Sequence, residues 1–553
     1  MRLLLCFLGA MAVSAVSAVT SAATLVYNVQ GYTMDHGKRV SFVALEYDGE
    51  RVTQLYKNAG ESAGSTAELK VDGHGATLLP GLIDAHGHLS NLGIALSAVD
   101  LVGSGSEAEA VQRTRDFMQK FPAEKWIVGR GWNQVVWPGQ QFPNRKSLDA
   151  IAADKPIALT RIDGHALWVN SIVLRRAGID NSTPDPDGGQ IVRDEQGEAT
   201  GVLIDNAMDL VSKVFPTPSD QQIQGYELRA MSYLASLGLT SAHDAGITAQ
   251  ELRAFQALRS AGKMPIRVYP MLHVLDPAND TYLQQGPIID PDHMLDLRSV
   301  KISSDGALGS RGAALFEDYS DRPGHRGLLL LSDDQLQHHI GRAMAAGYQV
   351  NTHAIGDLAN AKVLDYYQAL IKKTDSQNLR HRIEHSQILR LADIPRFAAG
   401  GIIASIQPTH ATSDKNMAGD RLGDQRLKGA YVWKSLLDSG ARVAGGSDFP
   451  VEPPNPFYGL HAAVTRQSRD NQPLGGWMQD QRLSREQSLS LFTEGAAYAA
   501  HQEDYLGRLL PGYYADFILV RDDYFTIPEQ DIWKNKVIAT YVAGSEVYRA
   551  EAD

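Results

Sequence analysis

Cysteine is almost missing from this chain: Cys6 is the only one among 553 residues. It lies in an N-terminal segment that we expect to be removed, so the mature protein would contain no thiol. Such a protein has no disulfides, no thiolate nucleophile and no zinc site with cysteine ligands. Any metal site must therefore be built from histidine and carboxylate side chains.

An excess of positive charge is also absent. Lysine and arginine together number 52 against 64 aspartates and glutamates, which gives a formal net charge of -12. Without a basic surface, nucleic acid and anionic membranes are not expected partners. The hydrophobic fraction of 43% and the charged fraction of 21% are those of a globular protein. We therefore expect a small-molecule partner, and a homo-oligomer stays open.

No apolar run in the sequence is long enough to cross a bilayer as a helix. The longest, Leu3 to Val16, follows the positive Met1-Arg2 and precedes the small residues Ser17 to Ala23. This pattern predicts a Sec-type signal peptide at residues 1–22, with an uncleaved anchor as the less favoured alternative. The protein is therefore expected to be periplasmic or secreted, with no membrane attachment after cleavage.

Both ends of the mature chain have the pattern of β-structure. Residues 23–79 alternate apolar and polar positions, as in Val40 to Leu45, and residues 505–553 contain the strand-like runs Asp516 to Val520 and Val537 to Gly544. Gly, Asp and Asn interrupt these runs as turn residues do. We expect the two ends to build one composite β-sandwich around the middle of the chain.

Residues 80–504 alternate short β runs with helical periods, which is typical of a parallel α/β fold. Nine segments are candidate strands: 82–85, 156–160, 240–243, 266–271, 299–303, 349–352, 382–384, 402–406 and 442–445. A β/α barrel needs eight. Segment 156–160 is taken as surplus, because residues 89–235 are too long for one crossover and contain a glycine-rich hairpin signature. The expected fold is α/β, a distorted TIM (β/α)8 barrel with an insertion at about 89–235 that covers the active site.

The first chemical motif, His86-Gly87-His88, ends the first predicted barrel strand. Side chains two residues apart on a strand point to the same face, so both imidazoles can reach one ion. In a β/α barrel the carboxyl ends of the strands carry the active site. A lone His-x-His is a weak signal, but here it ends an apolar strand and precedes a loop.

Further strand ends carry the same kinds of side chain. His353, His385 and Asp448 each end a predicted strand, and Lys301 lies inside another. A single histidine is more often structural than a ligand. Four histidines and an aspartate at successive strand ends instead predict a metal site, because imidazole and carboxylate are the zinc ligands that a thiol-free protein has.

These residues occur in the order seen in the metal-dependent hydrolases of the amidohydrolase superfamily. More narrowly, five segments resemble the amidohydrolase family 3 branch, which includes N-substituted formamide deformylases and exoenzyme regulators. The segments are Trp126 to Asn133, Asp163 to Asn170, Lys301 to Ala314, His353 to Asp357 and Ser447 to Val451. The resemblance covers nearly all of the mature chain and implies a distorted barrel with a composite β-sandwich.

The resemblance also implies a role for each candidate ligand. It assigns His86, His88 and Asp448 to one metal ion, assigns His353 and His385 to a second, and makes Lys301 a bridging carbamate. Two divalent ions are expected, zinc first, with manganese and iron as alternatives. For Lys301 the competing interpretation is a salt bridge with Asp305 or another carboxylate, which would leave one ion. The carbamate that bridges two ions is favoured.

The expected reaction follows from the charge of such ions. A divalent ion lowers the pKa of bound water from 15.7 to about 7, which makes hydroxide available as a nucleophile at neutral pH. Asp448 is then the expected general base and acid. The favoured function is an exported amidohydrolase that cleaves a C–N bond in a non-peptide amide or an N-substituted formamide. The alternatives are deamination, lactone or dipeptide hydrolysis at the same site, and a non-catalytic regulatory or binding protein.

Substrate-binding residues are harder to select. His165 in the insertion, His410 after the seventh barrel strand and Arg311 are candidates, with loop hydrogen bonding or pairing to an internal carboxylate as the alternative roles. Four tryptophans crowd the insertion and suggest packing together with an apolar pocket wall: Trp126, Trp132, Trp137 and Trp168. An aryl or alkyl amide is therefore expected before a highly charged substrate.

Overall fold

A computed structural model describes residues 22–152, 154–162, 164–186, 189–215 and 217–551. The predicted signal peptide therefore lies, except for its last residue, outside the described residues. No helix in the described part of the chain is long and apolar enough to cross a membrane.

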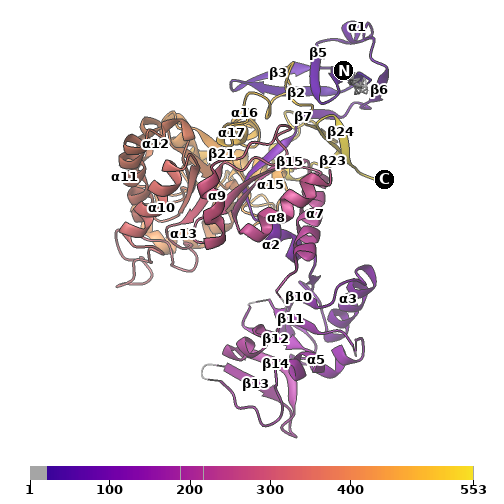
Figure 1. The fold of residues 1–553 in the computed structure, drawn as a ribbon, viewed down its shortest axis with the longest axis vertical. Coiled ribbons are helices and arrows are strands. Elements are labelled where there is room, and N and C mark those ends of the chain that lie inside the picture. Colours follow the sequence, from indigo (N-terminus) through magenta and orange to yellow (C-terminus); the bar gives the residue numbers. More distant parts are fainter. Residues whose placement is uncertain (1–21, 153, 163, 187–188, 216, 552–553) are drawn as a thin grey trace, which may run out of the picture.

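The centre of the molecule is an eight-stranded parallel barrel (Figure 1). All eight predicted barrel strands are confirmed. In chain order they are β8 (Leu82–Gly87), β15 (Leu239–Ile247), β16 (Arg267–His273), β17 (Ser299–Ser303), β18 (Gln349–Ala354), β19 (Arg382–His385), β20 (Ile403–Ile406) and β21 (Val443–Gly445). Each strand pairs with the next, and a backbone bridge between Gly87 and Phe449 nearly closes the ring between β21 and β8.

Helices cover the outside of the barrel, so its strands are buried on both faces. They are α7 (Asp220–Ser236), α8 (Ala249–Ser260), α9 (Asp280–Gln285), α10 (Asp333–Ala345), α11 (Asp357–Thr374), α12 (Ile394–Gly400), α13 (Pro408–Leu427), α14 (Trp433–Asp438), α15 (Pro456–Thr465), α16 (Arg485–Leu491) and α17 (Glu494–Ala499). One core cluster joins strands and helices, with Val300, Val350 and Ile383 fully buried. Continuous apolar runs suit this environment, whereas alternating strands suit a sheet with one wet face.

Strands from both chain ends pair with each other in a six-stranded sheet of order β24-β23-β22-β7-β2-β3. Its members are β2 (Gln30–Asp35), β3 (Lys38–Phe42), β7 (Thr77–Pro80), β22 (Phe517–Val520), β23 (Val537–Val542) and β24 (Ser545–Arg549). A four-stranded sheet lies beside it and is formed by β1 (Thr24–Tyr27), β4 (Ala44–Asp48), β5 (Arg51–Tyr56) and β6 (Leu69–Asp72). A shared core that includes Leu45, Leu78 and Phe517 holds the two sheets together.

The insertion forms a separate six-stranded sheet at the opposite end of the molecule from these terminal sheets (Figure 1). Its strands are β9 (Val99–Asp100), β10 (Ile127–Trp132), β11 (Ile157–Arg161), β12 (Ala166–Val169), β13 (Gly189–Arg193) and β14 (Ala199–Asp205). Its helices are α3 (Glu107–Lys120), α4 (Arg145–Asp149), α5 (Ser171–Arg176) and α6 (Asp209–Ser212). The segment predicted to be surplus is β11, and the glycine-rich hairpin is the antiparallel pair β13 and β14. Helices α2 (Leu89–Leu96) and α7 pack together where the insertion leaves the barrel.

Candidate metal centre and active site

The predicted ligands His86, His88 and Asp448 meet where the barrel closes. His86 lies on β8 and is fully buried, and His88 follows directly after this strand. Asp448 follows β21, and its backbone N–H donates to the carbonyl oxygen of His86 at 2.7 Å. Its Oδ1 lies 3.1 Å from His88 Nε2 and 3.5 Å from His86 Nε2. Three potential ligand atoms are thereby held within 4.8 Å of one another.

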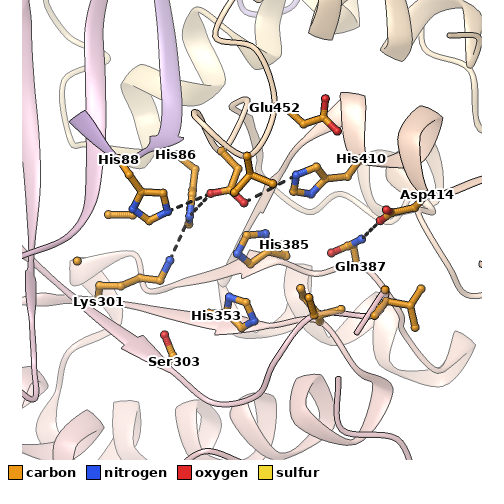
Figure 2. A pocket seen from close by; sticks show the side chains of 18 of the residues that line it. His86, His88, Lys301, Ser303, His353, His385, Gln387, His410, Asp414 and Glu452 are labelled. Carbon is orange, nitrogen blue, oxygen red and sulfur yellow. Dashed lines mark hydrogen bonds and ion pairs between the residues drawn. The ribbon is translucent and has the colours of Figure 1, made fainter. Parts of the chain in front are cut away.

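Lys301 reaches this cluster from β17. Its side chain is 5% exposed, and Nζ lies 3.1 Å from His86 Nε2 (Figure 2). Burial lowers the pKa of the ammonium group to about 8, because a charge in a poorly hydrated interior is costly. The competing salt bridge with Asp305 is not formed: the carboxylate of Asp305 accepts the backbone N–H groups of Ala314, Ile355 and Gly356 instead.

His353 on β18 and His385 at the end of β19 face each other, with ring centroids 4.4 Å apart. His385 also lies 4.8 Å from the ring of His86. Burial, followed by the neighbouring charge of Lys301, lowers the pKa of His353 to about 3, and burial likewise holds the pKa of His385 well below its usual range. Both rings are therefore neutral at physiological pH, which is the form that binds metal.

His410 also belongs to this cluster. It lies in the first turn of α13, stacks over His385 at 6.1 Å and brings Nε2 to 3.8 Å from Asp448 Oδ2. Ligand atoms of His385, His410 and Asp448 form a second group within 4.8 Å. The sequence suggested His410 as a substrate-binding residue, and the geometry places it equally well as a metal ligand.

Two charged residues behind the site were not found from the sequence. Glu384 Oε2 accepts a hydrogen bond of 2.5 Å from His86 Nδ1, and Arg382 holds the other carboxylate oxygen of Glu384 at 2.8 Å. Burial alone would raise the pKa of Glu384, but Arg382 and His86 hold it well below its usual range. The bond fixes the proton of His86 on Nδ1 and leaves Nε2 for a metal. The available signal was the pair of opposite charges, Arg382 and Glu384, inside a predicted barrel strand.

A second buried carboxylate positions the loop that carries Asp448. Asp84 on β8 accepts hydrogen bonds from the backbone and the hydroxyl of Ser447, at 3.1 and 2.7 Å, and from the backbone of His86 at 3.0 Å. It therefore ties β8 directly to the residue before Asp448.

The clustered side chains line one cavity of about 580 Å³ at the carboxyl ends of the barrel strands. Figure 2 shows the histidines and Lys301 turned toward its centre. The remaining lining residues include His273, Ser303, Gln387, Asp414, Val451 and Glu452. A volume of this order suits a small organic substrate.

His165 and Arg311, both suggested as substrate-binding residues, do not line this cavity. The His165 side chain is 74% exposed on the insertion and bonds to Asp205 at 2.8 Å. Arg311 forms an ion pair with Asp321 at 2.8 Å. Its partner is therefore a carboxylate of the protein itself, which was the alternative to a role in substrate binding.

The insertion does not cover the cavity, contrary to the sequence-based expectation. No described residue between 89 and 235 lines it, and the insertion lies away from the barrel (Figure 1). Its apolar surface is used internally: Trp132, Trp137 and Trp168 pack against one another in a core of their own. The packing role of these tryptophans is therefore observed, and the pocket-wall role is not.

The donor set fits divalent ions. Nε2 of His353 and Nε2 of His410 are buried and have no hydrogen-bond partner among the described residues, and an unsatisfied buried nitrogen is costly unless something binds it. His88 hydrogen-bonds to Asp448 and holds the pKa of its carboxyl group well below the usual range, against the effect of burial. Neutral imidazoles and a carboxylate together are typical zinc ligands.

A β/α barrel with histidines and an aspartate at the carboxyl ends of its strands is the arrangement of a metal-dependent hydrolase. The sequence profile of the amidohydrolase family matches residues 70–548. The chain belongs to the amidohydrolase family, in the family 3 branch that the sequence resembled.

Individual relatives agree with this assignment. The chain is 34% identical to YtcJ of Bacillus subtilis (strain 168) over 524 residues, which are 94% of this chain and 98% of that protein. It is 27% identical to the N-substituted formamide deformylase of Arthrobacter pascens, over 86% of this chain and 89% of that enzyme. Among solved structures, an uncharacterized metal-dependent hydrolase from Pyrococcus furiosus matches with a TM-score of 0.75 and 28% identity, covering 91% of this chain and 100% of that one.

Proposed function

We propose that this protein hydrolyses the C–N bond of a small non-peptide amide, with N-substituted formamides as the first substrates to test. The observation that carries the proposal is the convergence of four histidines, Asp448 and Lys301 on one cavity. The similarity to an N-substituted formamide deformylase supports the choice of bond.

Two divalent ions, with zinc expected, would supply a water of lowered pKa and polarise the substrate carbonyl. In the proposed site His86, His88 and Asp448 would hold the first ion. His353 and His385 would hold the second, and His410 lies close enough to His385 and Asp448 to add a further ligand.

Lys301 is proposed to join the two ions as a carbamate. Its neutral amine attacks carbon dioxide, forms a new N–C bond and releases one proton, which leaves an anionic group with two oxygen ligands. An ammonium group cannot react in this way, because it has no lone pair. The lowered pKa of about 8 makes the neutral amine accessible.

Asp448 is proposed to carry the proton. Its Oδ1 is held by His88, while Oδ2 faces His410 across 3.8 Å. In hydrolysis an oxygen of water bonds to the carbonyl carbon, the C–N bond breaks, and Asp448 moves the proton from the attacking water to the leaving nitrogen. Amine and carboxylic acid, or formate, are the products.

We further propose that the protein is exported to the periplasm or the medium and acts on a small molecule rather than on nucleic acid. The predicted signal peptide supports export. Expression in a Gram-negative host, followed by fractionation and N-terminal sequencing, tests it: a mature N-terminus near residue 23 is expected, and an intact Met1 in the cytoplasm contradicts it.

The test of the activity is a turnover assay with N-substituted formamides and other N-acyl amines. Protein purified with zinc should release amine, lose activity with a chelator and regain it with zinc or manganese. Cyclic amides, lactones, dipeptides and aminated heterocycles in the same panel test the alternative reactions. Absence of turnover on every compound, with metal bound, would contradict a hydrolytic function.

A further inference from the structure

One end of the cavity carries polar groups that the proposed reaction does not use. Gln387, two residues beyond β19, and Asp414 on α13 both line it. Gln387 Nε2 donates to Asp414 Oδ2 at 2.9 Å and to the hydroxyl of Tyr431 at 3.0 Å. The same hydroxyl donates to Asp414 Oδ2 at 2.7 Å.

This network fixes which way the Gln387 amide points. A carboxylate oxygen can only accept, so the amide must turn its N–H₂ group toward Asp414. Its carbonyl oxygen Oε1 consequently faces the cavity, toward His385 (Figure 2). Gln387 is 2% exposed, and Oε1 has no hydrogen-bond partner among the described residues. A buried acceptor without a donor from the protein can accept a hydrogen bond from a ligand in the cavity.

Asp414 leaves a second acceptor open. Both of its hydrogen bonds with described side chains end on Oδ2, so Oδ1 is available. The adjacent Lys415 does not neutralise it, because its ammonium group bonds to the Ser468 hydroxyl and the Thr412 carbonyl, at 2.5 and 2.8 Å.

The charges on the cavity wall also favour a ligand that donates hydrogen bonds. Apart from the proposed metal ligands, the charged residues of the described cavity wall are Asp414 and Glu452. An anionic substrate would find no cation here beyond the metal site, whereas a cationic donor meets fixed acceptors.

We propose that this end of the cavity recognises a protonated amino group on the substrate, with Asp414 Oδ1 and Gln387 Oε1 accepting its N–H bonds. The inference rests on the proposed amide hydrolysis and narrows its substrate class to amides or formamides that carry a primary amine away from the scissile bond. Asp414 and Gln387 are thus specificity residues, anchored by Tyr431.

The test compares two matched substrates: an N-formyl aniline with an aminomethyl substituent and the same compound with a hydroxymethyl substituent. The zinc-loaded wild type should prefer the amine in kcat/KM. In Asp414→Asn the ratio of the two kcat/KM values should fall about tenfold to a hundredfold, because a charge-assisted hydrogen bond becomes a neutral one. Asp420→Asn, an exposed position on the same helix, should leave the ratio unchanged. An unchanged ratio in Asp414→Asn would overturn the inference.

Direct binding separates this inference from the proposed function. Titration calorimetry compares the affinities of the zinc-loaded wild type for benzylamine and for benzyl alcohol. This comparison requires neither turnover nor a variant. Tighter binding of benzylamine, weakened about tenfold or more in Asp414→Asn, supports the amine site even if no amide is cleaved. Equal binding of the two probes, or a preference that Asp414→Asn leaves intact, overturns it.

Discussion

At the scale of single residues, burial decides the protonation of the site before any metal arrives. The pKa of His86 is lowered to about 4, first by desolvation and then by Lys301. His86, like His353 and His385, can therefore bind metal at neutral pH without first losing a proton, and competition from protons for these three imidazoles should begin only in acid. Asp448 is an anion for the opposite reason: its histidine neighbours outweigh the desolvation that would protonate it.

Asp448→Asn tests the proton-transfer role. The amide keeps an oxygen that can face His88 but cannot accept the proton of the attacking water. We expect kcat to fall by about 10²- to 10⁴-fold with the fold retained, as measured by steady-state turnover, circular dichroism and elemental analysis. Near wild-type turnover with metal bound would show that another group moves the proton.

Glu384→Gln tests the support behind the ligands. Loss of the anion weakens the orientation and basicity of His86 and leaves Arg382 without its buried partner, so zinc affinity should fall by about 10- to 100-fold. Competition with a fluorescent chelator measures this change. Glu68→Gln, at an exposed position of the terminal segment, is the matched control. If both variants keep wild-type affinity, the His86–Glu384 bond does not tune the metal.

The histidines proposed as ligands and Asp448 could be selected from the sequence because each lies at the end of a recognisable strand, and period two places His86 and His88 on one face. The roles of Glu384 and Arg382 could not be predicted, because their contacts outside β19 are made with other strands of the barrel. Glu384 contacts His86 on β8, and Arg382 contacts His243 on β15 at 3.0 Å. The sequence indicated His410 as a substrate-binding candidate. Its closeness to Asp448 could not be predicted, because it depends on where α13 begins.

At the scale of elements, the seam between β8 and β21 sets the distances between His86, His88 and Asp448, the residues proposed to hold the first ion. Few backbone contacts close it: the bridge from Gly87 to Phe449 and the bond from Asp448 to His86. Gly446 lies against this seam. A Cβ placed there would approach the His86 backbone nitrogen and Asp84 Oδ1 to 2.6 Å each.

Gly446→Ala should therefore force the seam apart. We expect a loss of about 1–3 kcal/mol in the free energy of unfolding together with weaker zinc binding, measured by denaturant unfolding and chelator competition. Gly419→Ala on α13 is the control, since a Cβ there meets nothing within 4 Å, and alanine should stabilise that helix by up to about 1 kcal/mol. Equal stability of the two variants would show that the seam tolerates a methyl group.

All eight barrel strands and the surplus β11 could be predicted, because apolar runs of strand length alternated with helical periods over most of the chain. The excess length of residues 89–235 excluded a simple crossover and so identified the insertion.

At the scale of the whole molecule, the insertion has its own apolar clusters, around Trp132 and around Leu203. The proposed metal ligands all belong to the barrel. The position of the insertion could not be predicted, because the same tryptophans can pack against each other or against a substrate, and only the tertiary structure shows that they pack against each other.

Calorimetry of the full chain should accordingly show metal acting on one part of the molecule. Zinc is expected to bind the folded barrel and so to raise the free energy of unfolding of the barrel by RT ln(1 + [L]/Kd), which is about 2.7 kcal/mol at a free zinc concentration a hundredfold above Kd. The insertion should unfold at an unchanged temperature. Scanning calorimetry with and without zinc measures both transitions. A single transition that shifts as a whole would show that the insertion and the barrel unfold as one unit.

The most direct test of the central claim, a two-ion site bridged by carboxylated Lys301, is the metal content of the chain. Elemental analysis of protein purified without chelators in bicarbonate buffer should give about two ions per chain, as expected for a two-metal hydrolase. Native mass spectrometry of the same sample should show the added mass of one carbon dioxide, and Lys301→Ala should lose this adduct, at least one ion and turnover. About one ion per chain, with no adduct and no loss of metal or activity in Lys301→Ala, would contradict the account.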